Sequence, residues 1–177
     1  MKKILLYNSG GGLGDSIQLF TLILSIQKYY KTSELFYLGA HENHFEGKLK
    51  EFNIKVTSLK LGIKYFGFRW WHFLVAKKRF LDLNFEKIDL IIDLQSKFRN
   101  TIILKKIPHK NFYSSTFSYS FCTNNEKYSS KDHLLNLNKF LNTKIEIHNY
   151  DLNLIPNKYV IEAERLLPGR NYIGFSL

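Results

Sequence analysis

The sequence predicts an α/β fold, a Rossmann-like parallel sheet with helices on both faces. Short continuous apolar runs lie at Lys3–Tyr7, Glu34–Gly39 and Ile88–Leu94, which is the pattern of strands buried on both faces. Longer segments with helical spacing separate these runs. The resulting alternation of strand and helix is typical of parallel sheets with right-handed crossovers.

The remaining elements follow the same alternation. We expect helices at Asp15–Tyr30, Phe45–Phe52, Tyr65–Leu83, Ser96–Lys106, Lys131–Asn142 and Lys158–Leu167, and strands at Ile54–Leu59, at His109–Ser114 and from Tyr172 onward. Between them, Ser115–Ser130 has no period and predicts a long loop that is mobile or shapes a binding site. The last strand has no sheet to cover it, so we expect the chain to be a fragment of a longer protein.

A glycine-rich loop, Asn8–Gly14, joins the first strand to the first helix. Its four glycines permit positive φ angles and close backbone approach to a ligand. The loop ends in Gly14-Asp15-Ser16, so it lacks the lysine with which a P-loop meets phosphates. A dinucleotide fingerprint starting at Gly10 has Asp15 in place of its third glycine, and a carboxylate there repels a pyrophosphate. Neither motif explains the loop.

Asp15 follows the carboxyl end of a buried strand, the edge at which open α/β sheets bind ligands. One interpretation is an N-cap or first-turn acid that satisfies free amides and the helix dipole. The other is a general base that accepts a proton from a hydroxyl nucleophile. Both can hold together, because a capped carboxylate is already oriented.

Composition restricts the class of protein. At 177 residues and 45% hydrophobic content, the chain can form one domain with a substantial core. The formal charge of +11 predicts an anionic partner, although an AT-rich genome also encodes chains rich in Lys, Asn, Ile, Phe and Tyr. Cys122 is the one cysteine, and no run reaches the roughly 20 apolar residues of a membrane span. Without a signal-peptide pattern, we expect a cytoplasmic location.

Two further segments leave alternatives open. Tyr65–Leu83 begins with aromatic residues and is basic in its middle. It predicts a crossover helix packed on the sheet or a helix at a membrane surface, with tryptophans in the headgroup region. His41 and His44 are three residues apart, but no third metal ligand is apparent, which favours a polar loop over a metal site.

A second set of polar residues follows the strand Ile88–Leu94. Asp93 and Gln95 flank Leu94, so an extended backbone directs both side chains to one side, where they can meet a sugar hydroxyl. Asp93 is equally suited to cap the helix that follows. That helix carries the cations Lys97 and Arg99.

Several of these motifs together resemble glycosyltransferase family 9, whose members add heptose to the inner core of lipopolysaccharide. The resemblance rests on Gly14-Asp15-Ser16 before an apolar helix, on Ile92-Asp93-Leu94-Gln95 with Arg99 one turn later, and on His133-Leu134-Leu135 at the start of a leucine-rich helix. Each motif is short, but their order and spacing agree over nearly the whole chain.

The resemblance implies the N-terminal half of a two-domain GT-B fold. Residues 1–150 would be the Rossmann-like acceptor domain, and 151–177 a linker and the start of a truncated donor-binding domain. The implied reaction is inverting transfer of a sugar from an ADP-activated donor to an anionic glycolipid, without metal or cofactor. The fragment alone is expected to be inactive. Asp15 falls on the family's catalytic base, and the implied acceptor contacts are Gly12, Gly14, Ser16, Asp93, Gln95, Lys97, Arg99 and His133.

Other functions compete with this transferase. A stand-alone Rossmann-like module could bind an anionic sugar or nucleotide at the glycine loop without chemistry. Nucleic-acid binding through Trp70, Trp71 and the lysines is the weakest alternative, because the basic residues are scattered and no recognised motif accompanies them. We therefore expect a nucleotide-sugar donor and a glycolipid acceptor, with peripheral contact to the inner membrane, and no nucleic acid.

Overall fold

A single parallel sheet organises the protein, as the sequence predicts. The computed structural model describes residues 2–95, 97–124, 126–128 and 132–167. Five strands pair in the order β3-β2-β1-β4-β5, and every pairing is parallel. The strands are β1 (Lys3–Asn8), β2 (Glu34–Gly39), β3 (Thr57–Ser58), β4 (Ile88–Asp93) and β5 (His109–Ser114).

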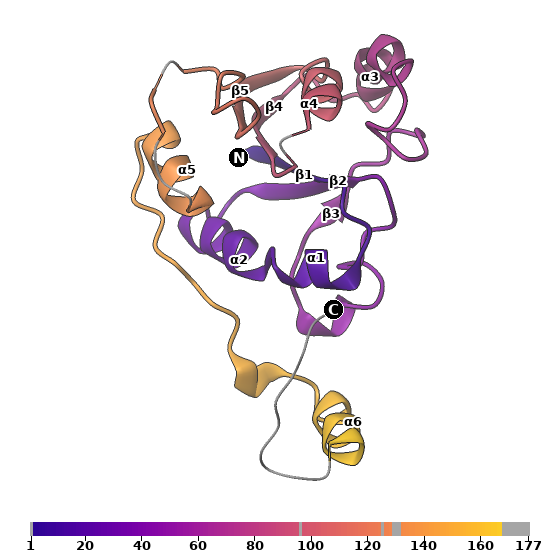
Figure 1. Ribbon diagram of the computed structural model, residues 1–177, viewed down its shortest axis with the longest axis vertical. Coiled ribbons are helices and arrows are strands. Elements are labelled where there is room, and N and C mark those ends of the chain that lie inside the picture. Colours follow the sequence, from indigo (N-terminus) through magenta and orange to yellow (C-terminus); the bar gives the residue numbers. More distant parts are fainter. Residues whose placement is uncertain (1, 96, 125, 129–131, 168–177) are drawn as a thin grey trace.

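Helices cover both faces of this sheet (Figure 1). They are α1 (Leu13–Ile17), α2 (Phe20–Tyr29), α3 (His72–Leu81), α4 (Phe98–Leu104), α5 (His133–Leu141) and α6 (Asn157–Leu166), with short 3₁₀ turns at Lys50–Phe52 and Leu152–Leu154. One face is covered by α2 and α5, and the other by α3 and α4. The expected Rossmann-like arrangement is confirmed.

Alternation along β1 divides the core between these two layers. Ile4 and Leu6 pack with residues of α2 and α5, while Leu5 and Tyr7 pack with residues of α3 and α4. All four side chains have 0% exposure. This double burial explains why β1 reads as a continuous apolar run in the sequence.

The strand order places a topological switch point between β1 and β4. From β1 the chain proceeds outward to β2 and β3, and then returns to build β4 and β5 on the other side. The register sets Tyr7 opposite Asp93, and Asp93 opposite Ser114, so these strands end at one edge of the sheet. Open α/β sheets bind ligands in the crevice at such a point.

The first helix differs from the continuous Asp15–Tyr30 helix that the sequence predicts. Two helices occupy this stretch, because the backbone at Leu19 bonds back only three residues, to the Ser16 carbonyl. Within α1, Ser16 is buried and Ile17 is 46% exposed. The break lets α1 end the glycine loop while α2 turns its own apolar side chains, among them Phe20 and Ile23, onto the sheet.

The helix expected at Tyr65–Leu83 begins seven residues late, at His72. Tyr65 and Gly67 have φ angles of 51° and 90°, which a right-handed helix cannot contain. Two side chains hold the turn: the Gly67 amide donates to His72 Nδ1, and the Gly67 carbonyl accepts from Arg99 Nε. The segment is therefore a clamped aromatic turn followed by a helix.

Two other expectations are only partly met, and two are not tested. The predicted strand Ile54–Leu59 pairs at Thr57–Ser58 alone, and the weak helix Phe45–Phe52 is a series of turns that ends in one 3₁₀ turn. The predicted strand from Tyr172 lies outside the described residues. The division between residues 1–150 and 151–177 stays a prediction.

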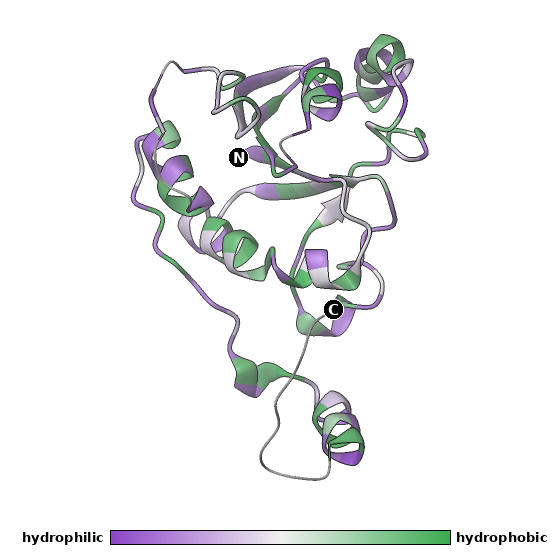
Figure 2. Ribbon diagram, viewed as in Figure 1, coloured by the Kyte–Doolittle hydropathy of each residue, from purple (hydrophilic) through white to green (hydrophobic). Residues whose placement is uncertain are grey.

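Among the described helices, α6 stands apart from the sheet in Figure 1 and has no buried residue. Figure 2 shows hydrophobic and hydrophilic residues interleaved along both α3 and α6. None of the helices in the described part of the chain has the length and apolar character needed to cross a bilayer.

Candidate functional site

A cavity of about 380 Å³ opens beside the carboxyl ends of β1 and β4, at the switch point. Its lining comes from four separate parts of the chain: Asn8 ends β1, Asp15 lies in α1, Gln95 follows β4, and His133 begins α5. The structure thus brings together three residues that the sequence singles out, Asp15, Gln95 and His133. The parallel register of β1 and β4 sets the strand ends at Asn8 and Gln95 side by side.

Asp15 lies in the first turn of α1, three residues after the N-cap Gly12. Its Oδ2 accepts a hydrogen bond of 3.2 Å from the Gly12 amide, and the side chain is exposed toward the cavity. The acid is therefore oriented by the helix start, as the first interpretation expects. Because Oδ1 is not engaged in that bond, the same carboxylate can also accept a proton from a hydroxyl.

Two of the loop glycines, Gly10 and Gly11, serve close packing, and none of the four loop glycines has the positive φ angle that the sequence permits. Among the described residues, the glycines with positive φ are Gly62 and Gly67, neither of which lies in the loop. A Cβ at Gly10 would approach the Asp15 carboxylate to 2.5 Å, and one at Gly11 would approach the His41 ring to 2.3 Å. A side chain at either position would collide with these groups, which explains Gly10 and Gly11, whereas a Cβ at Gly14 would meet open space.

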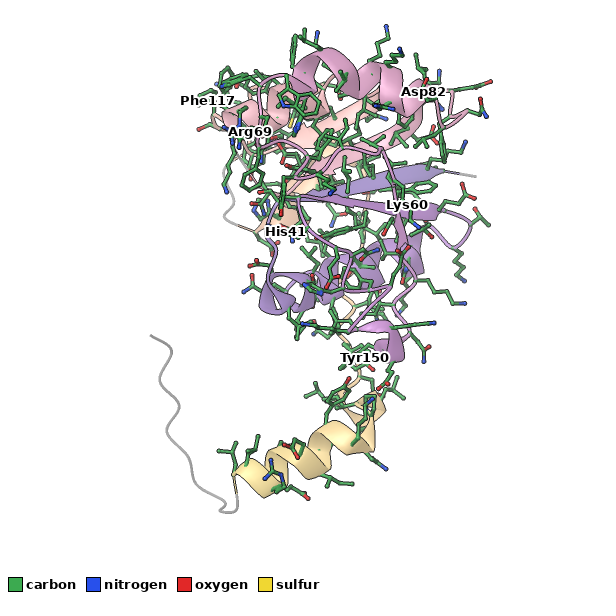
Figure 3. All side chains as sticks on the ribbon, turned by 90° about the vertical axis from the view of Figure 1, so that its right-hand side faces the viewer. His41, Lys60, Arg69, Asp82, Phe117 and Tyr150 are labelled. Atoms are coloured by element: carbon green, nitrogen blue, oxygen red, sulfur yellow. The ribbon has the colours of Figure 1, made fainter. Side chains whose placement is uncertain are left out.

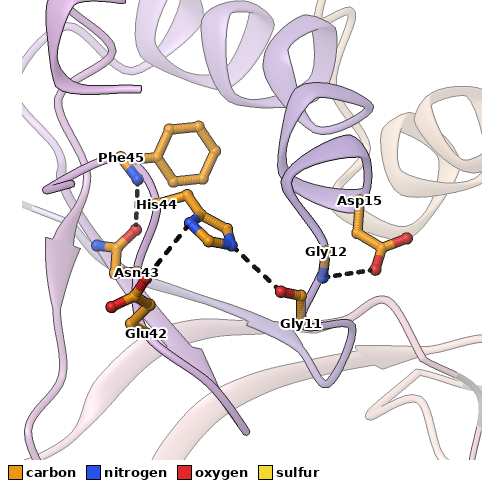
Figure 4. A network of polar contacts seen from close by, with 7 residues as sticks. All are labelled: Gly11, Gly12, Asp15, Glu42, Asn43, His44 and Phe45. Atoms are coloured by element: carbon orange, nitrogen blue, oxygen red, sulfur yellow. Dashed lines mark hydrogen bonds and ion pairs between the residues drawn. The ribbon is translucent and has the colours of Figure 1, made fainter. Parts of the chain in front are cut away.

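Figure 4 shows how the loop is held on the side away from Asp15. His44 is 7% exposed, and its Nε2 lies 3.2 Å from the Gly11 carbonyl, to which it donates. Its Nδ1 lies 3.9 Å from a carboxylate oxygen of Glu42. Since His44 bonds the loop and His41 packs on it, the two histidines act on the loop separately.

Gln95 is fixed in the cavity by the end of β1. Its Oε1 accepts from the Ser9 hydroxyl at 2.7 Å, and its Nε2 donates to Asn8 Oδ1 at 2.5 Å. Asn8 Oδ1 also accepts from the amide of Gly10. The amide of Gln95 thereby ties the end of β4 to the glycine loop, and it reaches the cavity with its orientation set.

Asp93 lies behind Gln95, and the structure contradicts its expected contact with a ligand. The side chain has 0% exposure and accepts hydrogen bonds from the Thr101 hydroxyl (2.6 Å), the Ser114 hydroxyl (2.8 Å) and the backbone N–H of Gln95 (3.1 Å). Nor does it cap α4, whose N-cap is Lys97. Burial raises the pKa of Asp93 above its ordinary value, and these hydrogen bonds oppose that rise. Asp93 supports Gln95 from within the protein.

The other predicted residues lie around the cavity. Ser16 is 1% exposed and offers no surface to a ligand, which contradicts its expected contact. Lys97 is exposed at the start of α4, and Arg99 is bonded to the Gly67 carbonyl on the face covered by α3 and α4. Neither cation lines the cavity. Gly12 and Gly14 lie beside Asp15 at the start of α1, and their acceptor contacts stay predictions.

Asn8, Gln18 and Asp132 also line the cavity and were missed by the sequence reasoning. Asp132 is the N-cap of α5, where its carboxylate accepts from the amides of Leu134 and Leu135. The sequence did contain a signal for Asp132, since an acid directly before a leucine-rich helix is a typical N-cap. The cap holds the helix start at which His133 faces the cavity, so two carboxylates, Asp15 and Asp132, share this site.

Comparison with known proteins gives one informative result. No family model matches the chain, and no curated protein matches it. A solved structure, the glycosyl transferase family 9 protein from Veillonella parvula DSM 2008, matches 94% of the chain with a TM-score of 0.57 at 17% identity. The chain therefore shares its fold with part of that protein. It covers 49% of the Veillonella protein, about half of that length.

At this identity the match to the glycosyltransferase establishes the fold and leaves the chemistry to be argued from the residues. The fold agrees with the architecture that the sequence motifs imply. The cavity lies at the switch point of this fold, where the chain gathers Asp15, Gln95 and His133.

Proposed function

We propose that this chain is the acceptor-binding domain of a glycosyltransferase, with Asp15 as the general base. The observation that carries the proposal is the convergence of Asp15, Gln95 and His133 on one cavity at the switch point. The fold shared with a glycosyltransferase family 9 protein supports the reaction class.

The geometry suits an inverting displacement. The exposed Asp15 carboxylate, held by the Gly12 amide, would take the proton of an acceptor hydroxyl as its oxygen attacks the anomeric carbon of the donor. The nucleotide leaves from the opposite side of that carbon. Gln95 and His133 would hold neighbouring hydroxyls, since both carry hydrogen-bonding groups into the cavity.

The alternative of a passive module for anionic ligands at the loop is less well supported. Asp15 and Asp132 both line the cavity, and no lysine or arginine does so in the described part of the chain. The carboxylates of Asp15 and Asp132 disfavour a phosphate in the cavity, whereas they suit a neutral sugar hydroxyl. The anionic groups of an acceptor would therefore lie outside the cavity, toward the exposed Lys97.

The finer assignments belong to the same proposal. By the family resemblance, the donor is an ADP-linked sugar, heptose in the family, and the acceptor is an anionic glycolipid of the lipopolysaccharide core, reached from the cytoplasm. No cofactor or metal is needed for the displacement. Because the chain is about half as long as its glycosyltransferase neighbour, we expect it to bind acceptor but not to turn over by itself.

The test compares Asp15→Asn with the unchanged protein. Using the complete gene product, ADP-heptose and a heptose-deficient lipopolysaccharide, we expect transfer to fall by roughly 10²- to 10⁴-fold, the usual contribution of a general base. Asp82→Asn, at an exposed acid outside the cavity, is the matched control and should transfer normally. Circular dichroism should show both variants folded, since each change is isosteric.

Acceptor binding is measured separately on the 177-residue chain. The same heptose-deficient lipopolysaccharide should shift the backbone amide signals of Asp15, Gln95 and His133 in NMR spectra. Full transfer by Asp15→Asn would reject the base. Signal shifts confined to other parts of the chain would reject the cavity as the acceptor site.

A further inference from the structure

We propose that the surface formed by Arg69, Trp70, Trp71, Leu74, Lys77 and Lys78, here called the α3 surface, docks on an anionic membrane. Its large apolar side chains face solvent: Trp70 is 57% exposed, Trp71 is 55% exposed and Leu74 is 77% exposed. Together with Phe73 and Ile102 they line an apolar groove. Contiguous exposed apolar surface of this kind marks an interaction site.

The exposed side of α3 is not a badly packed core face. The opposite side of the same helix is fully buried, through His72, Ala76 and Phe80. The turn that presents the tryptophans is clamped, because Gly67 bonds both His72 and Arg99. The indoles are therefore held outward by a stable scaffold.

Charge favours an anionic membrane as the occupant. From residue 52 to residue 81 the sequence contains no Asp or Glu, and it contains seven basic residues: Lys55, Lys60, Lys64, Arg69, Lys77, Lys78 and Arg79. The next acid, Asp82, is the C-cap of α3, at the end of the helix opposite to Arg69 (Figure 3). Tryptophans among exposed lysines are typical of helices that lie at the headgroup region of anionic lipids.

A second copy of the chain fits this surface less well. A symmetric contact through the α3 surface would bring Arg69, Lys77 and Lys78 against their own copies, with no acid in the segment to pair them. A bilayer instead supplies phosphates for the cations and an apolar region for the indoles. The two kinds of side chain on this surface are thus both satisfied by one partner.

The aromatic turn that directly precedes the α3 surface contacts the cavity loop. The His41 ring packs on Gly11 and lies 5.6 Å from the Tyr65 ring and 6.5 Å from the Phe68 ring, centroid to centroid. Figure 3 shows His41 and Arg69 toward the same side of the molecule. Docking would therefore hold the glycine loop near the lipid headgroups. The idea that docking presents a membrane-anchored acceptor to Asp15 rests on the proposed function, whereas the docking itself does not.

The chain provides its own probe for the test. Trp70 and Trp71 are the two tryptophans of the sequence, so its tryptophan fluorescence reports from the α3 surface. Adding vesicles of phosphatidylcholine and phosphatidylglycerol should shift the emission to shorter wavelength, and brominated acyl chains should quench it. Phosphatidylcholine vesicles alone should have a much smaller effect. No emission change with the anionic vesicles would overturn the proposal.

Variants assign the binding to this surface by vesicle sedimentation. Replacing Lys77 and Lys78 by alanine should weaken partition into the vesicles roughly fivefold for each charge removed. Added salt should weaken the partition of the unchanged protein. Trp70→Ala with Trp71→Ala should weaken it by roughly tenfold or more, since about 55 Å² of apolar area corresponds to a tenfold change. Ile161→Ser, at a 64% exposed position on α6, is the matched control and should bind normally.

Three further results would overturn the proposal. One is equal loss of partition in Ile161→Ser, which would mean that any exposed apolar residue drives binding. Another is a shift of tryptophan emission with protein concentration in the absence of lipid, which would indicate self-association. The third is displacement of the protein from vesicles by single-stranded DNA at equal charge, which would favour nucleic acid. None of these results depends on sugar transfer, so they leave the proposed function to its own test.

Discussion

Replacing Thr101 by valine tests the buried hydrogen bonds that support the cavity. The Thr101 hydroxyl donates to Asp93 Oδ2 at 2.6 Å, and both side chains have 0% exposure. Valine keeps the shape and removes the donor. The Thr116 hydroxyl, 2.7 Å from Thr101, can turn to Ser114 instead, so the main loss is one hydrogen bond to a buried carboxylate.

The magnitude follows from that single loss. A hydrogen bond to a charged group contributes about 1.5–3 kcal/mol, so the free energy of unfolding at pH 7.5 should fall by about 2 kcal/mol. For a chain of this length, that corresponds to a decrease in Tm of roughly 4–8 °C. Thr101→Ser keeps the hydroxyl donor and should lose clearly less stability than Thr101→Val.

The stability lost in Thr101→Val should depend on pH, and the direction of that dependence follows from the pKa of Asp93. Burial already raises the pKa of Asp93 above its ordinary value of 3.8, and removing a donor raises it further. As the pH falls through the pKa of the folded state, the carboxyl takes up a proton in the native protein before it does so in the unfolded chain. Native Asp93 is then no longer a buried charge, so the deficit of Thr101→Val should shrink toward pH 4.5.

Urea unfolding at pH 7.5 and 4.5, followed by circular dichroism, measures both quantities. Three results would refute the reasoning. The first is a valine variant as stable as the unchanged protein at pH 7.5. The second is a serine variant that loses as much stability as valine. The third is a deficit that grows as the pH falls.

Two further predictions concern a pair of histidines and a pair of glycines. Burial lowers the pKa of His72 and His109 below 6.5 in the folded protein, so near and below that pH the unfolded chain binds more protons than the folded protein and the free energy of unfolding falls. Replacing both residues (His72→Asn with His109→Asn) should flatten this pH dependence in urea titrations from pH 7.5 to 5.5. Gly67→Ala should cost about 2–5 kcal/mol, because φ is +90° and the new Cβ would lie 2.4 Å from the buried Tyr7 hydroxyl. Gly62→Ala, with φ of +66° and open space, should cost only about 1–2 kcal/mol, and equal losses in thermal melts would contradict the packing argument.

Local patterns in the sequence were sufficient for the sheet. The runs at β1, β2 and β4 are buried on both faces and therefore apolar throughout, which makes them visible without any knowledge of their partners. The position of Asp15 in the first helical turn was visible for a similar reason, because a helix start depends on a few neighbouring residues.

Long-range contacts were not visible in the sequence. The turn at Gly67 exists because Arg99, 32 residues away, bonds its carbonyl, so the pattern of Tyr65–Leu83 reads as one helix although α3 begins at His72. Likewise, Gly10 lies against the Asp15 carboxylate and Gly11 against the His41 ring. No sequence pattern relates these glycines to those side chains.

The site divides in the same way between sequence and tertiary structure. The sequence by itself determined which residue types stand at the ends of β1 and β4, and so it marked Asp15, Asp93 and Gln95. Only the tertiary structure decided that Asp93 is buried under Thr101 and Ser114 while Gln95 reaches the cavity. The reason is physical: residue type and spacing fix which groups can donate or accept, but the register of β4 against β5 fixes which of them remain open to a ligand.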